Sequence, residues 1–311
     1  MKYELDKEWK KEVDGHTVYR VIALRDIYYT NDEREVQSTS KGACGGWIES
    51  ESNLSQDGNC WVDDEAVVYG DAVVKGDAIV CGNSIVKNNA IVRGNAYVGK
   101  DWWCDDDDDE QGVIIRDNAE IYCGAIILGY ALIGGNAHVL GNATIRDNAV
   151  VRGDVVISGN ATVCGEARIS GKTKVFGESF IYDQAYILGD VTIDGKAYIG
   201  GNALVRDNAI VQGATLIRGR AMIKDSVEIN GFTLVEGCAI VEGNSKIDGY
   251  AKIYDSAIIS GTSHISGFSI VHDEARVKDS TIGGSIEICE TANIFNKELF
   301  SPRLKVTDDK E

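Results

Sequence analysis

The chain has 311 residues, with 49 acidic and 31 basic side chains, so its formal net charge is −18. Such a surface repels phosphate backbones and anionic lipids, which argues against nucleic-acid binding and against adhesion to a membrane. The charged first ten residues are unlike a signal peptide, and no apolar run approaches the length of a membrane span. We therefore expect a cytoplasmic protein.

The eight cysteines are scattered, with no CxxC pair and no histidine at a spacing typical of zinc sites. We interpret them as reduced thiols. The cysteine and histidine pattern accordingly predicts no metal site and no resident cofactor.

Residues 1–46 do not follow the repeat that occupies most of the chain. The run from Thr17 to Tyr29 is typical of one or two strands. We predict an N-terminal β cap here, because the end of a repeat array would otherwise expose an unpaired edge and an open core. Trp47 or Trp61 is expected to fill that end.

From Cys60 onward the chain repeats a six-residue unit, with a small residue first, Val or Ile third, and commonly Gly or Asp fifth. An acidic insertion at 102–112 interrupts it, and 28 hexads then run without insertion or deletion from Val113 to Ser280. A one-residue slip is expected at Gly283–Gly284. The predicted divisions are a cap at 1–46, a repeat domain at 47–297, and a closing cap and tail at 298–311.

Each hexad predicts one very short strand followed by a tight corner. The first and third side chains point inward in period-two alternation, and Gly, Asp or Asn supplies the positive φ that a corner needs. Three hexads then make one coil of triangular section, and each strand pairs with the strands three hexads before and after it. We predict an all-β parallel β-helix, a β-solenoid of about twelve coils.

The hexads resemble the hexapeptide repeat of left-handed β-helix proteins, a family that includes many trimeric acyltransferases. Left-handed winding is what this resemblance implies. The segment Gly45-Gly-Trp-Ile-Glu-Ser-Glu-Ser-Asn-Leu-Ser-Gln-Asp-Gly-Asn-Cys-Trp-Val62 is similar, more narrowly, to the lead-in of YdcK-type proteins and of related bacterial and phage-encoded proteins.

Second-position side chains three hexads apart should stack on one outer face. The first face is mostly apolar, which predicts a homo-oligomer, dimer or trimer, that associates through it. Its predicted interface residues are Ile114, Leu132, Val150, Tyr186, Leu204, Met222, Ile240 and Ile258. The second face is mostly polar and includes Glu120, His138, His264 and, in this register, Ile282.

Hexapeptide acyltransferases generally use a histidine on an outer face as a general base, which makes His138 the best-placed candidate. Glu120 lies one coil before it, so its carboxylate could orient the imidazole ring. The alternative is an ordinary surface histidine, since His264 and His272 are not expected to cluster with it.

The insertion is the least repetitive part of the helix. Two tryptophans and an acidic run could dock a partner protein or hold Ca²⁺ or Mg²⁺ weakly, or form only a solvated loop. The candidate binding residues are Trp102, Trp103, Asp105, Asp106, Asp107, Asp108 and Asp109.

The sequence favours a non-catalytic oligomeric scaffold that presents rigid flat faces to a protein partner. The alternative, implied by the resemblance, is an acyl-CoA-dependent acyltransferase with His138 as the base and Glu120 beside it.

Overall fold

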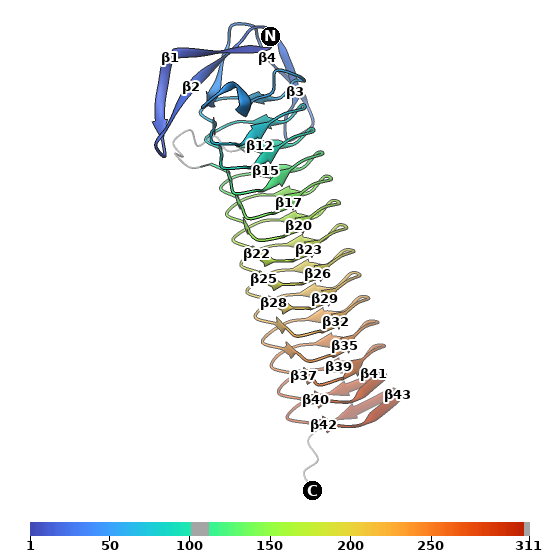
Figure 1. Cartoon of the computed structure of the whole chain (residues 1–311). Helices are drawn as coiled ribbons and strands as arrows, with labels where there is room; N and C mark the ends of the chain where they lie inside the picture. Colours follow the sequence, from blue (N-terminus) through green and yellow to red (C-terminus); the bar gives the residue numbers. More distant parts are fainter. Residues whose placement is uncertain (101–111, 308–311) are drawn as a thin grey trace. The chain divides into compact units, whose positions relative to one another are not determined.

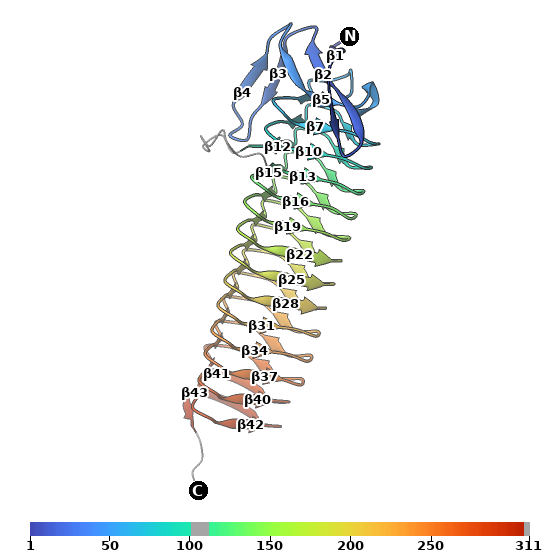
Figure 2. The same cartoon turned by 90° about the vertical axis from the view of Figure 1, so that its left-hand side faces the viewer.

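The computed structural model describes residues 1–100 and 112–307, which fall into two compact units, Met1–Cys164 and Gly165–Glu311. Figures 1 and 2 show the short strands of each unit as successive rungs. No helix among the described residues is long and apolar enough to cross a membrane.

The first unit begins with a cap of antiparallel strands. Strands β1, β2 and β5 form one sheet, β3 and β4 form a separate hairpin, and one short 3-10 helix follows. Their bounds are β1 (Tyr3–Val13), β2 (His16–Ala23), β3 (Ile27–Thr30), β4 (Val36–Thr39), β5 (Cys44–Ile48) and η1 (Glu51–Asn53).

Parallel strands continue the first unit in three columns. The first column follows β5 with β7 (Val67–Val68), β10 (Ile85–Val86), β13 (Ile114–Ile115), β16 (Leu132–Ile133) and β19 (Val150–Val151). The second contains β8 (Val73–Val74), β11 (Ile91–Val92), β14 (Glu120–Ile121), β17 (His138–Val139) and β20 (Val156–Ile157). The third contains β6 (Trp61–Val62), β9 (Ile79–Val80), β12 (Tyr97–Gly99), β15 (Ile126–Leu128), β18 (Thr144–Ile145) and β21 (Thr162–Val163).

The second unit also consists of parallel strands in three columns. The first contains β22 (Arg168–Gly171), β25 (Tyr186–Gly189), β28 (Leu204–Asp207), β31 (Met222–Ile223), β34 (Ile240–Val241), β37 (Ile258–Ser260), β40 (Arg276–Lys278) and β42 (Asn293–Phe295). The second contains β23 (Lys174–Val175), β26 (Thr192–Ile193), β29 (Ile210–Val211), β32 (Glu228–Ile229), β35 (Lys246–Ile247) and β38 (His264–Ile265). The third contains β24 (Phe180–Ile181), β27 (Tyr198–Ile199), β30 (Leu216–Ile217), β33 (Leu234–Val235), β36 (Lys252–Ile253) and β39 (Ile270–Val271).

Two longer strands end the second unit. Strand β41 (Thr281–Ile288) pairs with β38 through its first half and with β39 through its second half, and β43 (Glu298–Val306) pairs in parallel with β41. The predicted all-β, left-handed parallel β-helix is confirmed. It has more coils than the twelve or so predicted, because β5 and β43 add strands that the hexad count omitted.

The corners form as the hexads predicted. Fifth-position residues adopt positive φ, for example 72° at Gly135 and 60° at Asp147. A Cβ added at Gly135 would lie 2.6 Å from the backbone nitrogen of Gly153, so glycine also allows the corners of adjacent coils to approach closely. Inward first and third positions, such as Ala185 and Ile187, are fully buried.

Trp61 lies in the first strand of the third column, beneath the cap. It is fully buried, and a Cβ added at Gly45 would lie 2.4 Å from its ring, so the cap packs directly on the indole. Trp47 instead stays partly exposed and pairs with Val67 in the first column.

The predicted hexad register was wrong near its end. The uninterrupted run stops before Ser280. Three full hexads would pair His264 with residue 282, but His264 pairs with Thr281, so one residue is missing from this coil. The shortened hexad is therefore the one that starts at Ala275, and the slip precedes Gly283–Gly284. As a result Ile282 aligns with the inward Ile265 and is fully buried, and Thr281 takes the place on the second face that was predicted for Ile282.

Candidate functional site

His138 and Glu120 lie next to each other on the second face of the first unit. They are the outward residues of β17 and β14, and their Cα atoms are partners in the parallel register. Nδ1 of His138 is 4.0 Å from Oε2 of Glu120, and the two side chains are 40% and 30% exposed. The three-hexad coil thus brings together the pair that the sequence predicted.

Two further side chains surround this pair. Arg93 places Nη2 3.4 Å from Oε2 of Glu120 and stacks its guanidinium 4.4 Å from the centroid of the Tyr122 ring. Tyr122 in turn meets the His138 ring edge-on, with ring centroids 6.4 Å apart. Arg93 therefore restrains the carboxylate, and Tyr122 restrains the imidazole.

The arrangement leaves one ring nitrogen of His138 available. Nδ1 faces Glu120, and Nε2 has no hydrogen-bond partner within residues 1–100 and 112–307. An imidazole held in this way can accept a proton through Nε2, while the carboxylate stabilises the imidazolium that results.

A second histidine cluster, which the sequence did not predict, lies in the second unit. His272 follows β39 and is only 16% exposed. Its Nε2 is 3.3 Å from Oε1 of Glu287, and its Nδ1 is 3.3 Å from Oδ2 of Asp273. The Tyr254 ring stacks on the imidazole with centroids 4.9 Å apart, at an interplanar angle of 14°.

The buried thiol of Cys289 belongs to the same cluster. One ligand atom from each of His272, Glu287 and Cys289 lies within 4.8 Å of the other two. Lys305 of β43 places Nζ 2.9 Å from Oε1 of Glu287. Hydrogen bonds from Lys305 and then from His272 lower the pKa of the Glu287 carboxyl, so it is ionised at neutral pH.

The predicted interface residues form two runs on consecutive coils of the first column, one run in each unit. In the first unit Ile114 pairs with Leu132, and Leu132 with Val150. In the second unit the same register aligns five residues, all but the first partly buried: Tyr186, Leu204, Met222, Ile240 and Ile258. The candidate loop residues Trp102, Trp103 and Asp105 to Asp109 lie outside the described residues.

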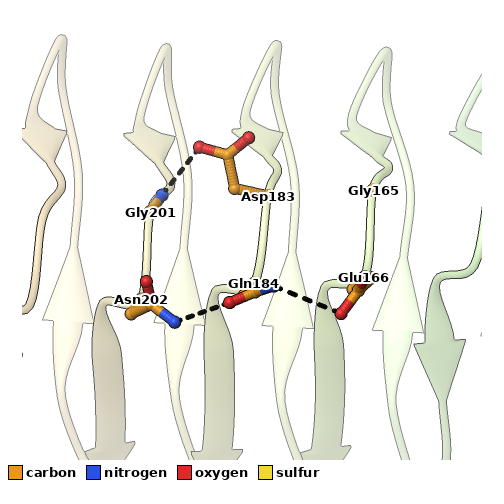
Figure 3. A pocket seen from close by; sticks show the side chains of 6 residues that line it. All are labelled: Gly165, Glu166, Asp183, Gln184, Gly201 and Asn202. Carbon is orange, nitrogen blue, oxygen red and sulfur yellow. Dashed lines mark hydrogen bonds between the residues drawn. The ribbon is translucent and has the colours of Figure 1, made fainter.

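A shallow depression in the second unit is lined by three successive corners, drawn in Figure 3. Its side chains mainly satisfy one another, because Asn202 donates to Gln184 at 2.7 Å, Gln184 donates to Glu166 at 3.4 Å, and the Gly201 amide donates to Asp183 at 3.0 Å. These hydrogen bonds between successive coils account for the polar residues at the corners, which therefore have a structural role.

Solved structures share the fold of this chain at low similarity, whereas no protein-family model and no curated protein matches it. The chain is similar to UDP-N-acetylglucosamine acyltransferases. The one from Arabidopsis is 13% identical, with 70% of this chain and 71% of that chain covered and a TM-score of 0.29.

The O-acyltransferase from Moraxella catarrhalis is 17% identical, and the acyltransferase from Campylobacter jejuni is 21% identical. Each comparison covers 56% of this chain and 68% of the other, with TM-scores of 0.23 and 0.24. Likenesses at this level do not identify an activity or a substrate.

Proposed function

We propose that this protein is an acyltransferase that uses acyl-CoA, with His138 as the general base and Glu120 as the residue that orients it. The observation that carries the proposal is the local geometry of His138. One ring nitrogen faces a restrained carboxylate, and the other is available to a substrate on the outer face of the β-helix. The resemblance of the hexads to acyltransferase repeats supports the same interpretation.

The chemistry follows from this geometry. Nε2 of His138 takes the proton from an acceptor hydroxyl or amine as the acceptor attacks the thioester carbonyl. The carbon–sulfur bond breaks, the acyl group stays on the acceptor, and the imidazolium returns its proton to the departing CoA thiolate. Glu120 stabilises the imidazolium, and Arg93 keeps Glu120 in position.

The test measures release of CoA from short and long acyl-CoA donors, with a panel of amino and hydroxyl sugars as acceptors. His138→Gln should lower the rate by about 10²- to 10⁴-fold, the usual contribution of a general base. His264→Gln is the matched control, since His264 also lies outward on a second-column strand and contacts a carboxylate, Asp248, at 3.0 Å.

Glu120→Gln tests the positioning role separately. It should lower kcat, because the imidazole loses the carboxylate that orients it, while acyl-CoA binding stays the same. Equal rates for wild type and His138→Gln would contradict the proposal. So would the absence of any acyl-CoA-dependent rise in melting temperature.

The second candidate function is an oligomeric scaffold that binds a protein partner. It is favoured by one observation, the alignment of Leu204, Met222, Ile240 and Ile258 on four consecutive coils of the second unit. A protein that fails to bind acyl-CoA but associates through this stripe would favour the scaffold. Cytoplasmic residence and the narrower YdcK-type resemblance remain predictions.

A further inference from the structure

We propose that His272, Glu287 and Cys289 form a binding site for a divalent transition-metal ion, and that zinc is the ion whose ligand preferences they match. The proposal is independent of the His138 site, because it concerns different residues in the other compact unit. The three ligands offer one nitrogen, one oxygen and one sulfur, a set that suits Zn²⁺ better than Ca²⁺ or Mg²⁺.

The distances already approach those of a tetrahedral site. Zinc–nitrogen and zinc–oxygen bonds of about 2.0–2.2 Å and zinc–sulfur bonds of about 2.3 Å imply ligand atoms about 3.3–3.8 Å apart. Nε2 of His272 and Oε1 of Glu287 are 3.3 Å apart. Sγ of Cys289 lies within 4.8 Å of one ring nitrogen of His272 and of one carboxylate oxygen of Glu287. Small side-chain rotations would therefore close the set.

The imidazole of His272 is held in the orientation that a ligand needs. Oδ2 of Asp273 lies 3.3 Å from Nδ1, and Nε2 is hydrogen-bonded to Oε1 of Glu287 at 3.3 Å. A metal ion at Nε2 would replace the proton of that hydrogen bond, while the Asp273 carboxylate stays beside Nδ1. A carboxylate behind a metal-binding histidine is a recurring feature of zinc sites. Stacking on Tyr254 keeps the ring from turning.

The shortened hexad is what places the thiol. The backbone N–H groups of three residues donate hydrogen bonds to carbonyl oxygens of the next coil: Tyr254 to Val271, His272 to Ile288, and Cys289 to Val306. Tyr254, His272 and Cys289 therefore occupy the same corner in three successive coils. With an unbroken period, Glu290 would occupy the position next to His272 in the following coil. Because that coil is one residue shorter, Cys289 occupies it instead, and the corner carries a thiol rather than a carboxylate.

Lys305 gives the site a competing cation. Its ammonium group holds Oε1 of Glu287 and would have to move away as the metal binds, and its side chain is 56% exposed and can do so. Cys289 loses its thiol proton to solvent when Sγ becomes a ligand. A solvent molecule completes the coordination, and the bound ion links the end of β39 to the end of β41 in the second unit.

The experiment titrates the chelator-treated full-length protein with Co²⁺, which reports its ligands by colour. We expect one equivalent to bind, with a thiolate-to-cobalt charge-transfer band, tetrahedral d–d absorption, and displacement of both by Zn²⁺. Cys289→Ser should abolish the charge-transfer band. Glu287→Gln should weaken binding by at least about tenfold, and Lys305→Met should strengthen it.

The matched control is Cys238→Ser, which removes an exposed thiol elsewhere in the same unit and should leave the spectrum unchanged. Zn²⁺ should also raise the melting temperature of the wild type and of Cys238→Ser but not of Cys289→Ser, which separates a lost ligand from a lost fold. The absence of a charge-transfer band in the wild type would overturn the proposal. Persistence of the band in Cys289→Ser, or cobalt binding that depends on Asp255 and Asp273 instead, would also overturn it.

Discussion

Glu65 connects three strands of the cap to the first coil of the β-helix. Its carboxylate accepts from Lys11 at 3.0 Å, from Arg20 at 2.8 Å, and from the indole nitrogen of Trp47 at 2.9 Å. The two cations also lie over the Trp47 ring, 4.5 and 4.8 Å from its centroid. Although Glu65 is a surface residue, β1, β2 and β5 all contact it.

This network predicts a loss of cap stability in acid. Partial burial alone would raise the pKa of Glu65, but the hydrogen bonds from Lys11, Arg20 and Trp47 lower it from 4.5 to about 2. Because the pKa of Glu65 is lower in the folded state, the ionised carboxylate stabilises the fold at pH values above its unfolded pKa of 4.5. This stabilisation is lost as the pH falls from 4.5 to about 2.

The measurement is the denaturation midpoint of the wild type and of Glu65→Gln between neutral and strongly acidic pH, followed by Trp fluorescence. Glu65→Gln should be less stable at neutral pH and should lose less stability on acidification. Glu8→Gln, at an exposed β1 residue with no ion pair in the described part of the chain, serves as the control. Parallel pH profiles for Glu65→Gln and wild type would refute the assignment.

At the scale of one element, β26 shows how each rung depends on its neighbours. Ile193 is fully buried and pairs with Val175 in the coil before and Val211 in the coil after. Ile193→Asp should unfold several coils of the second unit, because an unpaired carboxylate would be placed in a core lined by aliphatic side chains.

The matched substitution Ile193→Val keeps the shape and should destabilise by only about 0.5–1.5 kcal/mol. Hydrogen exchange of the coils around β26 distinguishes the two outcomes. Full protection of β23, β26 and β29 in Ile193→Asp would show that these coils do not depend on one another.

The elements were predictable wherever the period held. Small and branched residues at fixed positions predicted the inward side chains and the three columns, and the constant three-hexad spacing predicted that Glu120 would contact His138. The His272 cluster was missed because its alignment depends on a coil that is one residue shorter. The sequence did contain a signal for the shorter coil. Ser280 is a small residue suited to a first position, and it comes 17 residues after Ser263, one residue fewer than three full hexads.

The sequence placed Tyr122 close to His138, and the two rings do meet. Arg93 could not be assigned to the site from the period alone, because it stands at a fourth position, where side chains leave the corner in directions that the spacing does not determine. Contacts across the cap were equally inaccessible, since Glu65, Lys11 and Arg20 belong to segments without a common repeat.

At the scale of the whole molecule, the apolar first column predicts association with further copies of the chain. Partly buried aliphatic side chains follow one another for four coils from Leu204 to Ile258, and adjacent coils are about 4.8 Å apart. Continuous apolar surface of this kind is typical of subunit interfaces.

Sedimentation equilibrium at micromolar concentration should give a mass two or three times the 33.6 kDa of one chain. Met222→Lys, in the middle of the stripe, should shift the mass toward that of one chain without changing the fold. Thr192→Lys, at an outward position of the second column, should leave the mass unchanged. A monomeric wild type would rule out the predicted interface.

The shortened coil also bears on how such a chain can change its length during evolution. Coils of three full hexads that contact only their neighbours can be duplicated or lost as whole modules, because every remaining side chain keeps its column. The segment from Val277 to Val306 is different, because its corner contacts depend on one omitted residue. It would have to be inherited as a single block, and length variation among descendants of this gene should fall on the coils before it.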